Sequence, residues 1–378
     1  MPSRPARSRR DPFDDVLRIA VLRGGGLGDL LFALPAIDAL AAAYPEAEIV
    51  LLGTRMHEEL LQGRPGSVSR VEVLPRARGV NSPDDSEDRG EIADFLTRMR
   101  ARRFDLACQL HGGGRHSNPF LAELRARHTI GTATDDALAL ERTMPYEYYQ
   151  HEVLRWLETV ALAGADPVSL DPRIIVTDGE RTAAAGHLAH GTAGRAVIHP
   201  GASDPRRRWP AERFAEVAGR LAGEGIQVLV VGEGADAHVA DGIADLASSS
   251  LVTSLGGRLS LGELAGLLAQ ADVFVGNDSG PRHLAQAVGC PTASVFWVGN
   301  LINGGPLTRT HHRVQLAWTT RCPVCGTDAT QVGWTAPRCE HDDSFVADVS
   351  VDAVWSDVSS LLDARPVHAV VATTFLGA

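Results

Sequence analysis

Short apolar runs alternate with amphipathic stretches from residue 18 onward, and this alternation sets the first expectation for the fold. Between the first two runs, Leu30, Leu34 and Ile37 recur at helical spacing, and Pro35 should kink that helix or lie in its first turns. The runs themselves are rich in aliphatic residues, which is typical of buried parallel strands; in the first half they cover 18–23, 48–54, 70–75 and 104–110. The pattern therefore predicts a parallel α/β architecture.

A second series of strand and helix patterns begins near residue 195, with strands expected at 196–200, 226–232, 251–255, 272–276 and 292–297. Helix signals lie between them. Pro210 suits a first helical turn, Ser260 with Glu263 forms a capping box, and Gly289 marks a helix end. Residues 166–194 are rich in proline, glycine and polar residues and divide the two series. We therefore expect two Rossmann-like domains facing each other across a cleft.

The expected domains follow from this division. A disordered tail covers 1–14, the first Rossmann-like domain 15–175, the second 185–348, and a last helix and tail 350–378.

Composition narrows the class of protein. The 378 residues are 44% hydrophobic and 22% charged, which is the balance of a globular protein. A net charge of −11 argues against nucleic acid as the main partner. No run of about 18 apolar residues predicts a transmembrane segment, and the arginine-rich N-terminus lacks the apolar core of a secretory signal. Five cysteines fit a reducing compartment, so we expect a cytoplasmic protein.

The glycine-rich segment 24–29, GGGLGD, follows a strand and opens a helix, so it could face an anion. A dinucleotide fingerprint would need a third glycine where Asp29 stands and an acid at the end of the second strand, and both are missing. The Gly-Lys-Ser/Thr ending of a P-loop is missing too. Two readings of Asp29 stay open at this point: a general base at the mouth of the cleft, or a cap of its own helix.

Two loops in the second half carry groups suited to a diphosphate. The segment 199–210 holds Arg206, Arg207 and Arg208, whose guanidinium groups can pair with phosphate oxygens, although an arginine run can also be a solvated surface. The segment 276–285 places Ser279 and Gly280 at a helix start, where free amides attract phosphate, although a simple N-cap would look the same. Both loops follow strands, where open α/β sheets bind ligands.

Three segments, LRGGGLGDLLFALPAIDAL, VIHPGASDPRRRWPAERFAEVA and NDSGPRHLAQAVGCP, resemble glycosyltransferase family 9 in the right order over residues 18–300. The best-known members of that family are ADP-heptose:lipopolysaccharide heptosyltransferases. The resemblance implies a GT-B fold, with the acceptor on the first domain and the nucleotide sugar on the second. It also implies transfer with inversion, no required metal and no further cofactor.

The resemblance also assigns the site residues. Asp29 matches the aspartate of the family's L-G-D motif and is the expected general base. Arg207 stands two residues before Trp209, where the family usually has a phosphate-binding lysine. Donor contacts are further expected from Ser203, Glu233 (ribose), Leu259 (base), Asp278, Ser279, Gly280 and His283, and acceptor contacts from His111 and Arg115.

Two C-terminal features lie outside this chemistry. Cys322, Cys325, Cys339 and His341 resemble a zinc knuckle, and a redox-sensitive cysteine pair is the alternative. The last helix pattern, 351–364, is similar in position to the GT-B helix that crosses back over the first domain.

Three functions remain in view. The first is transfer of a sugar, expected to be heptose from ADP-heptose, to a hydroxyl of a glycan, lipid-linked or secondary-metabolite acceptor. The others are a GT-B nucleotide-sugar epimerase and a nucleotide-sugar-binding protein without turnover. We expect a monomer that has a nucleotide sugar and an acceptor as its partners, with a peripheral contact at the inner membrane left open.

Overall fold

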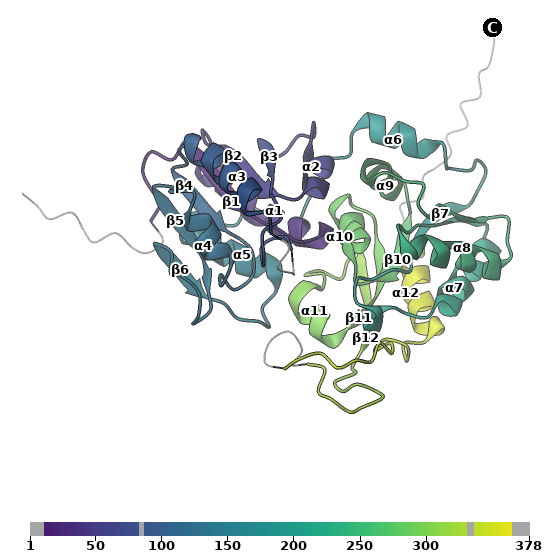
Figure 1. Ribbon diagram of the computed structural model, residues 1–378. Coiled ribbons are helices and arrows are strands. Elements are labelled where there is room, and N and C mark those ends of the chain that lie inside the picture. Colours follow the sequence, from purple (N-terminus) through teal and green to yellow (C-terminus); the bar gives the residue numbers. More distant parts are fainter. Residues whose placement is uncertain (1–10, 83–86, 331–335, 365–378) are drawn as a thin grey trace, which may run out of the picture.

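The computed structural model describes residues 11–82, 87–330 and 336–364 and contains two parallel sheets of six strands each (Figure 1). The first sheet has the order β3-β2-β1-β4-β5-β6. Its elements are β1 (Arg18–Leu22), α1 (Leu27–Ala43), β2 (Glu48–Gly53), α2 (Arg55–Leu61), β3 (Arg70–Val73), α3 (Arg89–Ala101), β4 (Leu106–Gln109), α4 (Ser117–Ala122), β5 (His128–Ala133), β6 (Arg142–Pro145) and α5 (Glu152–Ala161).

The second sheet has the order β12-β11-β10-β7-β8-β9, which repeats the pattern of the first when read from the other edge. Its elements are α6 (Asp178–Ala185), β7 (Gly194–His199), the 3-10 turn η1 (Pro205–Arg207), α7 (Ala211–Gly223), β8 (Ile226–Val230), α8 (Ala235–Ala247), β9 (Val252–Ser254), α9 (Leu261–Leu268), β10 (Val273–Asn277), α10 (Gly280–Ala287), β11 (Thr292–Trp297), α11 (Val298–Gly304), β12 (His312–Ala317) and α12 (Val351–Asp363).

Burial explains why these segments form parallel strands. All five residues of β8 and of β10 are buried, because helices cover both faces of the sheet. The capping box predicted at Ser260 is present, since its hydroxyl accepts from the Glu263 amide and the Glu263 carboxylate accepts in return. Pro35 lies buried in the middle of α1 instead of its first turns. The predicted α/β fold with two Rossmann-like sheets is confirmed.

Each sheet has one point where the strand order reverses, between β1 and β4 and between β7 and β10. Ligands of open α/β sheets bind outside the carboxyl ends of strands at such points. GGGLGD follows β1, whereas the arginine-rich loop follows β7 and NDSGP follows β10. The fold therefore brings all three sequence motifs to the reversal points of the two sheets.

Helices α1 and α10 meet with their N-terminal ends at the centre of the molecule (Figure 1). Two glycines allow this approach. A Cβ at Gly280 would lie 2.9 Å from the Leu27 Cβ, and one at Gly28 would lie 3.1 Å from the His283 ring. The rings of Phe32 and His283 then pack edge to face, with centroids 4.6 Å apart. Both helix N-termini consequently face the same interdomain space.

One expectation needs correction. The described residues of α12 pack on β10, β11, β12 and α7 of the second domain, so this helix does not cross onto the first domain as predicted. Helix α6 lies between the two expected domains and packs on α9. Strands β5, β6 and β12 were not predicted, because polar residues interrupt their apolar pattern. No helix in 11–82, 87–330 or 336–364 has the length and apolar character needed to span a membrane.

Candidate active site in the interdomain cleft

A cavity of about 990 Å³ lies between the two domains and is lined by both. From the first domain it receives residues of α1, α2 and the start of α5. From the second it receives the loops that follow β7, β8, β9 and β10. All nine residues predicted for catalysis and donor binding line this one cavity: Asp29, Ser203, Arg207, Glu233, Leu259, Asp278, Ser279, Gly280 and His283.

Asp29 lies in the first turn of α1 with its carboxylate in the cavity and its side chain about half exposed. One carboxylate oxygen accepts from Arg23 Nη2 at 2.8 Å, and the other accepts from the Gly26 amide, also at 2.8 Å. These two bonds fix the carboxylate in one orientation and leave it open to the cavity. A fixed, accessible carboxylate can accept a proton from a bound hydroxyl.

Arg23 was not predicted and is the main support of Asp29. Its side chain is 2% exposed, donates from Nε to the Asp29 carbonyl at 2.8 Å and from Nη1 to the Leu110 carbonyl at 2.7 Å. It also lies 3.5 Å from the Glu152 carboxylate and over the Trp156 ring. The guanidinium therefore joins the ends of β1 and β4 beneath the base.

His57 supports the same turn from α2. The ring is fully buried, which lowers its pKa to about 4, although its hydrogen bond to Gly26 acts in the opposite direction. Its Nδ1 accepts from the Thr54 amide at 3.2 Å, so Nε2 carries the proton and donates to the Gly26 carbonyl at 3.3 Å. A neutral imidazole thus holds the backbone that precedes Asp29.

The arginine run after β7 is divided by the 3-10 turn. Arg206 turns away from the cavity, pairs with Asp204 and lies over the Phe345 ring. Arg207 and Arg208 face the cavity. Arg207 donates to Ser203 Oγ at 2.7 Å and to Asp278 Oδ2 at 3.0 Å, so two cationic groups and a hydroxyl lie at the edge of the expected phosphate site.

Asp278 connects the polar side chains on the second domain's side of the cavity. It is 6% exposed, and its Oδ2 accepts from Arg207 and from Asn300 Nδ2 at 2.8 Å, while Oδ1 accepts from His283 Nε2 at 3.0 Å. Burial acts to raise the pKa of Asp278, but the His283 hydrogen bond and the nearby positive groups outweigh it and the pKa is lowered. With both oxygens occupied, this carboxylate positions Arg207 for an anion.

His283 is a neutral link in the same network. Arg282 donates to its Nδ1 at 3.1 Å, so the ring proton is on Nε2, which donates to Asp278. Burial lowers the pKa of His283, and the adjacent Arg282 lowers it further, against the effect of Asp278. The ring therefore orients the acid and does not serve as a cation for phosphate.

The N-terminus of α10 faces the cavity at Ser279 and Gly280. Ser279 makes no side-chain capping bond to its helix, because its hydroxyl lies 3.1 Å from His199 Nδ1 instead. Burial lowers the pKa of His199 to about 4, so this partner is neutral. The first amides of α10 are thus not capped by the serine side chain, and the helix dipole favours an anion there.

The far end of the cavity is apolar and is formed by the loops after β8 and β9. Its side chains are Val231, Leu255, Leu259, Leu261 and Leu264. Glu233 lies at its rim and is exposed, whereas Asp236 lies 3.4 Å from Arg208. An apolar end next to a cationic end matches the polarity of a nucleoside diphosphate, with its base at one end and its phosphates at the other.

The first domain contributes a different lining. Three carboxylates, Asp29, Glu59 and Glu152, face the cavity from this side, together with Met56 and Phe32. The predicted acceptor residues lie outside this lining. His111 packs beside the glycine turn, where burial and Arg23 lower its pKa to about 4, and Arg115 is 70% exposed and lies 3.4 Å from Asp136.

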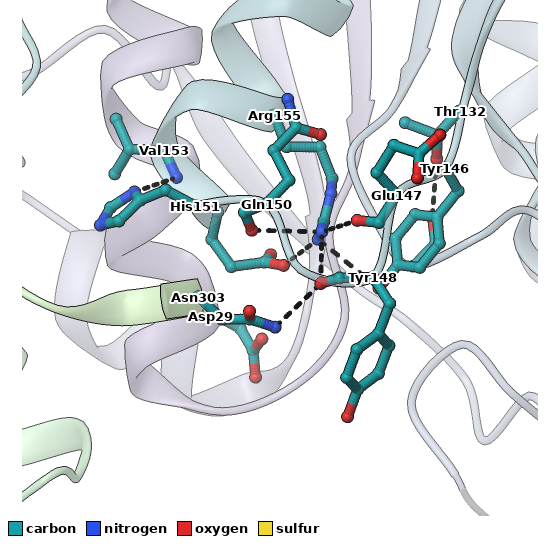
Figure 2. Close-up of polar contacts among 12 residues, drawn as sticks. Asp29, Thr132, Tyr146, Glu147, Tyr148, Gln150, His151, Val153, Arg155 and Asn303 are labelled. Carbon is teal, nitrogen blue, oxygen red and sulfur yellow. Dashed lines mark hydrogen bonds and ion pairs between the residues drawn. The ribbon is translucent and has the colours of Figure 1, made fainter. Parts of the chain in front are cut away.

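Hydrogen bonds connect the domains beside the base (Figure 2). Asn303 donates to the Tyr148 carbonyl at 3.1 Å, and His151 donates from Nε2 to the Gly305 carbonyl at 2.7 Å. Figure 2 shows Arg155 at the centre of the loop that contains Tyr148, bonded to several of its carbonyl oxygens. This loop is one of the first domain's contacts with α11, together with Phe32 and α5, so it helps set the width of the cleft.

Sequence reasoning missed several residues of the site, among them the cavity residues Glu152, His199 and Asn300, and Arg23, which lies beneath Asp29. A signal existed for two of them. Arg23 directly precedes the glycine turn, and His199 ends β7, so both occupy the reversal points of the sheets. Asn300 and Glu152 come from helices with no recognisable motif, and only the tertiary structure brings them to the cavity.

Two facing Rossmann-type domains with a cleft between them are the arrangement of the GT-B fold. A sequence model described as glycosyltransferase family 9 (heptosyltransferase) matches residues 92–325. Lipopolysaccharide heptosyltransferase 2 of Salmonella typhimurium is 25% identical over 296 residues, which cover 74% of this chain and 82% of that protein.

Two solved structures share the fold. The E. coli ADP-heptose lps heptosyltransferase II has a TM-score of 0.71 at 20% identity, over 92% of this chain and 98% of that one. A glycosyl transferase family 9 protein from Veillonella parvula has a TM-score of 0.74 at 18% identity, over 95% and 100%. The chain belongs to glycosyltransferase family 9, the heptosyltransferase family.

Proposed function

We propose that the protein transfers heptose from ADP-heptose to a hydroxyl group, with inversion at the anomeric carbon and without a metal ion. The observation that carries this proposal is the composition of one cavity. A fixed carboxylate, Asp29, faces it from the first domain, and Arg207 with the N-terminus of α10 faces it from the second. A base and an anion site that meet in one cavity are the two elements that a single displacement needs.

The donor half supports a nucleoside diphosphate sugar. The apolar end around Leu259 suits a base, Glu233 at its rim suits ribose hydroxyls, and Arg207 with Ser203 suits the phosphates. Adenine and heptose are inferred from the family and from the structural neighbour named as an ADP-heptose heptosyltransferase. Arginine replaces the usual lysine here in a chain that contains no lysine, and its planar fork pairs well with phosphate.

In the proposed reaction Asp29 accepts the proton of the acceptor hydroxyl as its oxygen attacks the anomeric carbon. The bond from that carbon to the diphosphate breaks, and the leaving ADP carries away the electron pair. Arg207 and the α10 amides stabilise the charge that develops on the diphosphate. In this proposal these protein groups do the work that a divalent metal ion does elsewhere.

The acceptor half favours an uncharged or amino-bearing acceptor. Asp29, Glu59 and Glu152 face the cavity, and no described arginine of the first domain lines it, since Arg23 is buried beneath Asp29. A phosphorylated or carboxylated acceptor would meet repulsion from these groups. A neutral glycan or an amino-sugar metabolite would avoid this repulsion. His111 and Arg115 stay predicted acceptor contacts, and neither lines the cavity.

The test is transfer by the purified protein, measured as ADP released from ADP-heptose with neutral, amino-bearing and phosphorylated acceptor sugars. Asp29→Asn should lower kcat by about 10²- to 10⁴-fold and leave ADP affinity unchanged. Asp38→Asn is the matched control, because Asp38 lies on the same helix but bonds Ser67 outside the cleft. Near-normal turnover by the Asp29 variant would refute the assignment of the base.

The anomeric configuration of the product, read by NMR, tests inversion, and retained activity in excess chelator tests metal independence. Release of free or epimerised sugar without any acceptor would instead indicate an epimerase. ADP-heptose binding without turnover on any acceptor would indicate a binding protein. Preference for a phosphorylated acceptor would overturn the acceptor class proposed here.

A further inference from the structure

A second cluster of reactive side chains lies away from the cleft, in the segment between β12 and α12. Cys322, Cys325, Cys339 and His341 each direct one potential ligand atom to a common point, and these atoms lie within 4.8 Å of one another. None of the four residues lines the interdomain cavity. The cluster joins two parts of the chain that are separated by the 13 residues between Cys325 and Cys339.

The first two cysteines lie at the tip of a small hairpin. Arg321 and Asp328 form an antiparallel bridge, and the Cys322 amide donates to the Thr327 carbonyl at 2.8 Å. The Gly326 amide then donates back to the Cys322 carbonyl at 3.0 Å, which needs the left-handed conformation that Gly326 has, with φ of 72°. This turn brings both thiols of Cys322-Pro-Val-Cys325 to one side.

His341 provides the second observation. Its Nδ1 is buried and makes no hydrogen bond, although a buried polar nitrogen without a partner is costly. All three cysteines are free thiols, and Cys322 is 3% exposed. The arrangement thus leaves an imidazole nitrogen and three sulfur atoms facing one another without satisfying the histidine.

We propose that Cys322, Cys325, Cys339 and His341 bind one structural zinc ion. Three thiolates and one imidazole form the closed, four-ligand set that structural zinc sites use, and the absence of an oxygen ligand from the set disfavours magnesium and calcium. A metal also explains the unpartnered His341 nitrogen. A disulfide between Cys322 and Cys325 would leave both Cys339 and His341 unexplained.

The site holds the wall of the second domain next to the donor cavity. Beyond the ligands, Phe345 packs near Trp297 and under Arg206, and its amide donates to the Arg206 carbonyl at 2.7 Å. Phe345 and Ala329 line a side cavity of about 230 Å³ that Arg207 also lines. Zinc binding would therefore fix the loop on which this flank is built, without a direct part in the reaction.

The hairpin also reaches the first domain. Tyr149 donates its hydroxyl hydrogen to the Thr330 carbonyl, two residues beyond the Arg321–Asp328 bridge. The loop with Tyr149 is the one that Arg155 holds beside the cleft. The segment that holds the proposed zinc site thus makes a further contact between the domains, in addition to those of α10 and α11.

Metal analysis of the full chain, purified without chelator or added metal, tests the proposal independently of transferase activity. We expect one zinc per chain. Cys325→Ser and His341→Ala should lose it, and Cys290→Ala is the control that should keep it, because Cys290 is buried in the core near Ala271. Iron in place of zinc, a chain without metal, or a Cys322–Cys325 disulfide found by mass spectrometry would each overturn the zinc assignment.

If the ligand variants do not fold, the metal content of the unaltered protein still decides whether the chain binds zinc. Cobalt exchanged into that protein should then give the visible absorption of a tetrahedral thiolate site, and an octahedral spectrum would contradict the ligand set. A strong chelator should lower the thermal unfolding midpoint of the zinc protein and leave that of the Cys325→Ser variant unchanged. These readouts hold whatever donor or acceptor the enzyme uses.

Discussion

Replacing Arg207 with alanine should weaken ADP binding more than any other single change in the arginine run. The guanidinium is 20% exposed, lies in the cavity, and is already oriented by Ser203 and Asp278. Binding of a diphosphate therefore adds charge-assisted hydrogen bonds without ordering a flexible side chain. Arg206, its neighbour, is directed away toward Asp204 and Phe345 and cannot replace it.

The size of the loss follows from these contacts. A hydrogen bond to a charged group contributes about 1.5–3 kcal/mol, which corresponds to an increase in Kd of about 10- to 100-fold. The substitution also removes the cation between Asp278 and the incoming phosphates. Because Asp278 is buried, its uncompensated charge would repel the ligand and move the effect toward the upper end of that range.

Isothermal titration with ADP measures the effect. Arg207→Lys keeps the charge but loses the planar fork, so its loss should be about tenfold or less. Arg220→Ala is the control, since Arg220 lies on α7 and pairs with Glu216 and Asp352 on the surface. If Arg207→Ala binds ADP as tightly as the unaltered protein, Arg207 does not contact the donor and the phosphate site lies elsewhere.

Three further changes test other parts of the site. Arg23→Lys should lower kcat about ten- to a hundredfold with little change in KM, because one ammonium group cannot hold Asp29, the Leu110 carbonyl and Glu152 together. An equal rise in KM would contradict a positioning role for Arg23. Gly280→Ala should lower the thermal unfolding midpoint by a few degrees, because the added Cβ would crowd α1 and cost about 1–3 kcal/mol of stability. An unchanged midpoint would contradict the close approach of the two helices. His57→Gln should flatten the loss of stability on acidification, measured by urea unfolding from pH 6.5 to 4.5. The folded-state pKa of about 4 lies below the unfolded value, so the unfolded chain takes up the proton first. The contribution of His57 to the free energy of unfolding therefore falls as the pH falls through that window, by at most about 1.4 kcal/mol per pH unit, and equal slopes in both proteins would refute a neutral buried ring.

The sequence predicted most of the strands and the donor motifs because these signals are local. A buried strand such as β8 is a short aliphatic run. The capping box of α9 joins Ser260 and Glu263 within one helical turn. The position of α12 was wrong for the opposite reason. Its apolar stripe shows that the helix packs against something, but its partner, the second sheet, is set by tertiary contacts that no local pattern encodes.

Local sequence patterns identified the motif residues, but tertiary contacts decide what each of them does. Asp278 belongs to the recognised NDSGP segment, yet its two oxygens are occupied by Arg207, Asn300 and His283, so it positions the cation instead of meeting phosphate itself. Arg206 and Arg207 look equivalent in sequence and point in opposite directions because a 3-10 turn lies between β7 and α7. Side-chain direction of this kind depends on neighbours distant in the chain.

The two glycine-rich turns differ in the third residue of the helices that follow them. In α1 this residue is Asp29, whose carboxylate accepts from the Gly26 amide and so occupies the N-terminal end of its own helix. In α10 the equivalent residue is Arg282, and Ser279 makes no side-chain capping bond, so no carboxylate of that helix fills its N-terminal end. We therefore expect the same strand-turn-helix unit to present a base in one domain and an anion site in the other. The two helix ends meet at one cavity, so this single difference in residue type would give the proposed transfer its direction, from acceptor to departing diphosphate.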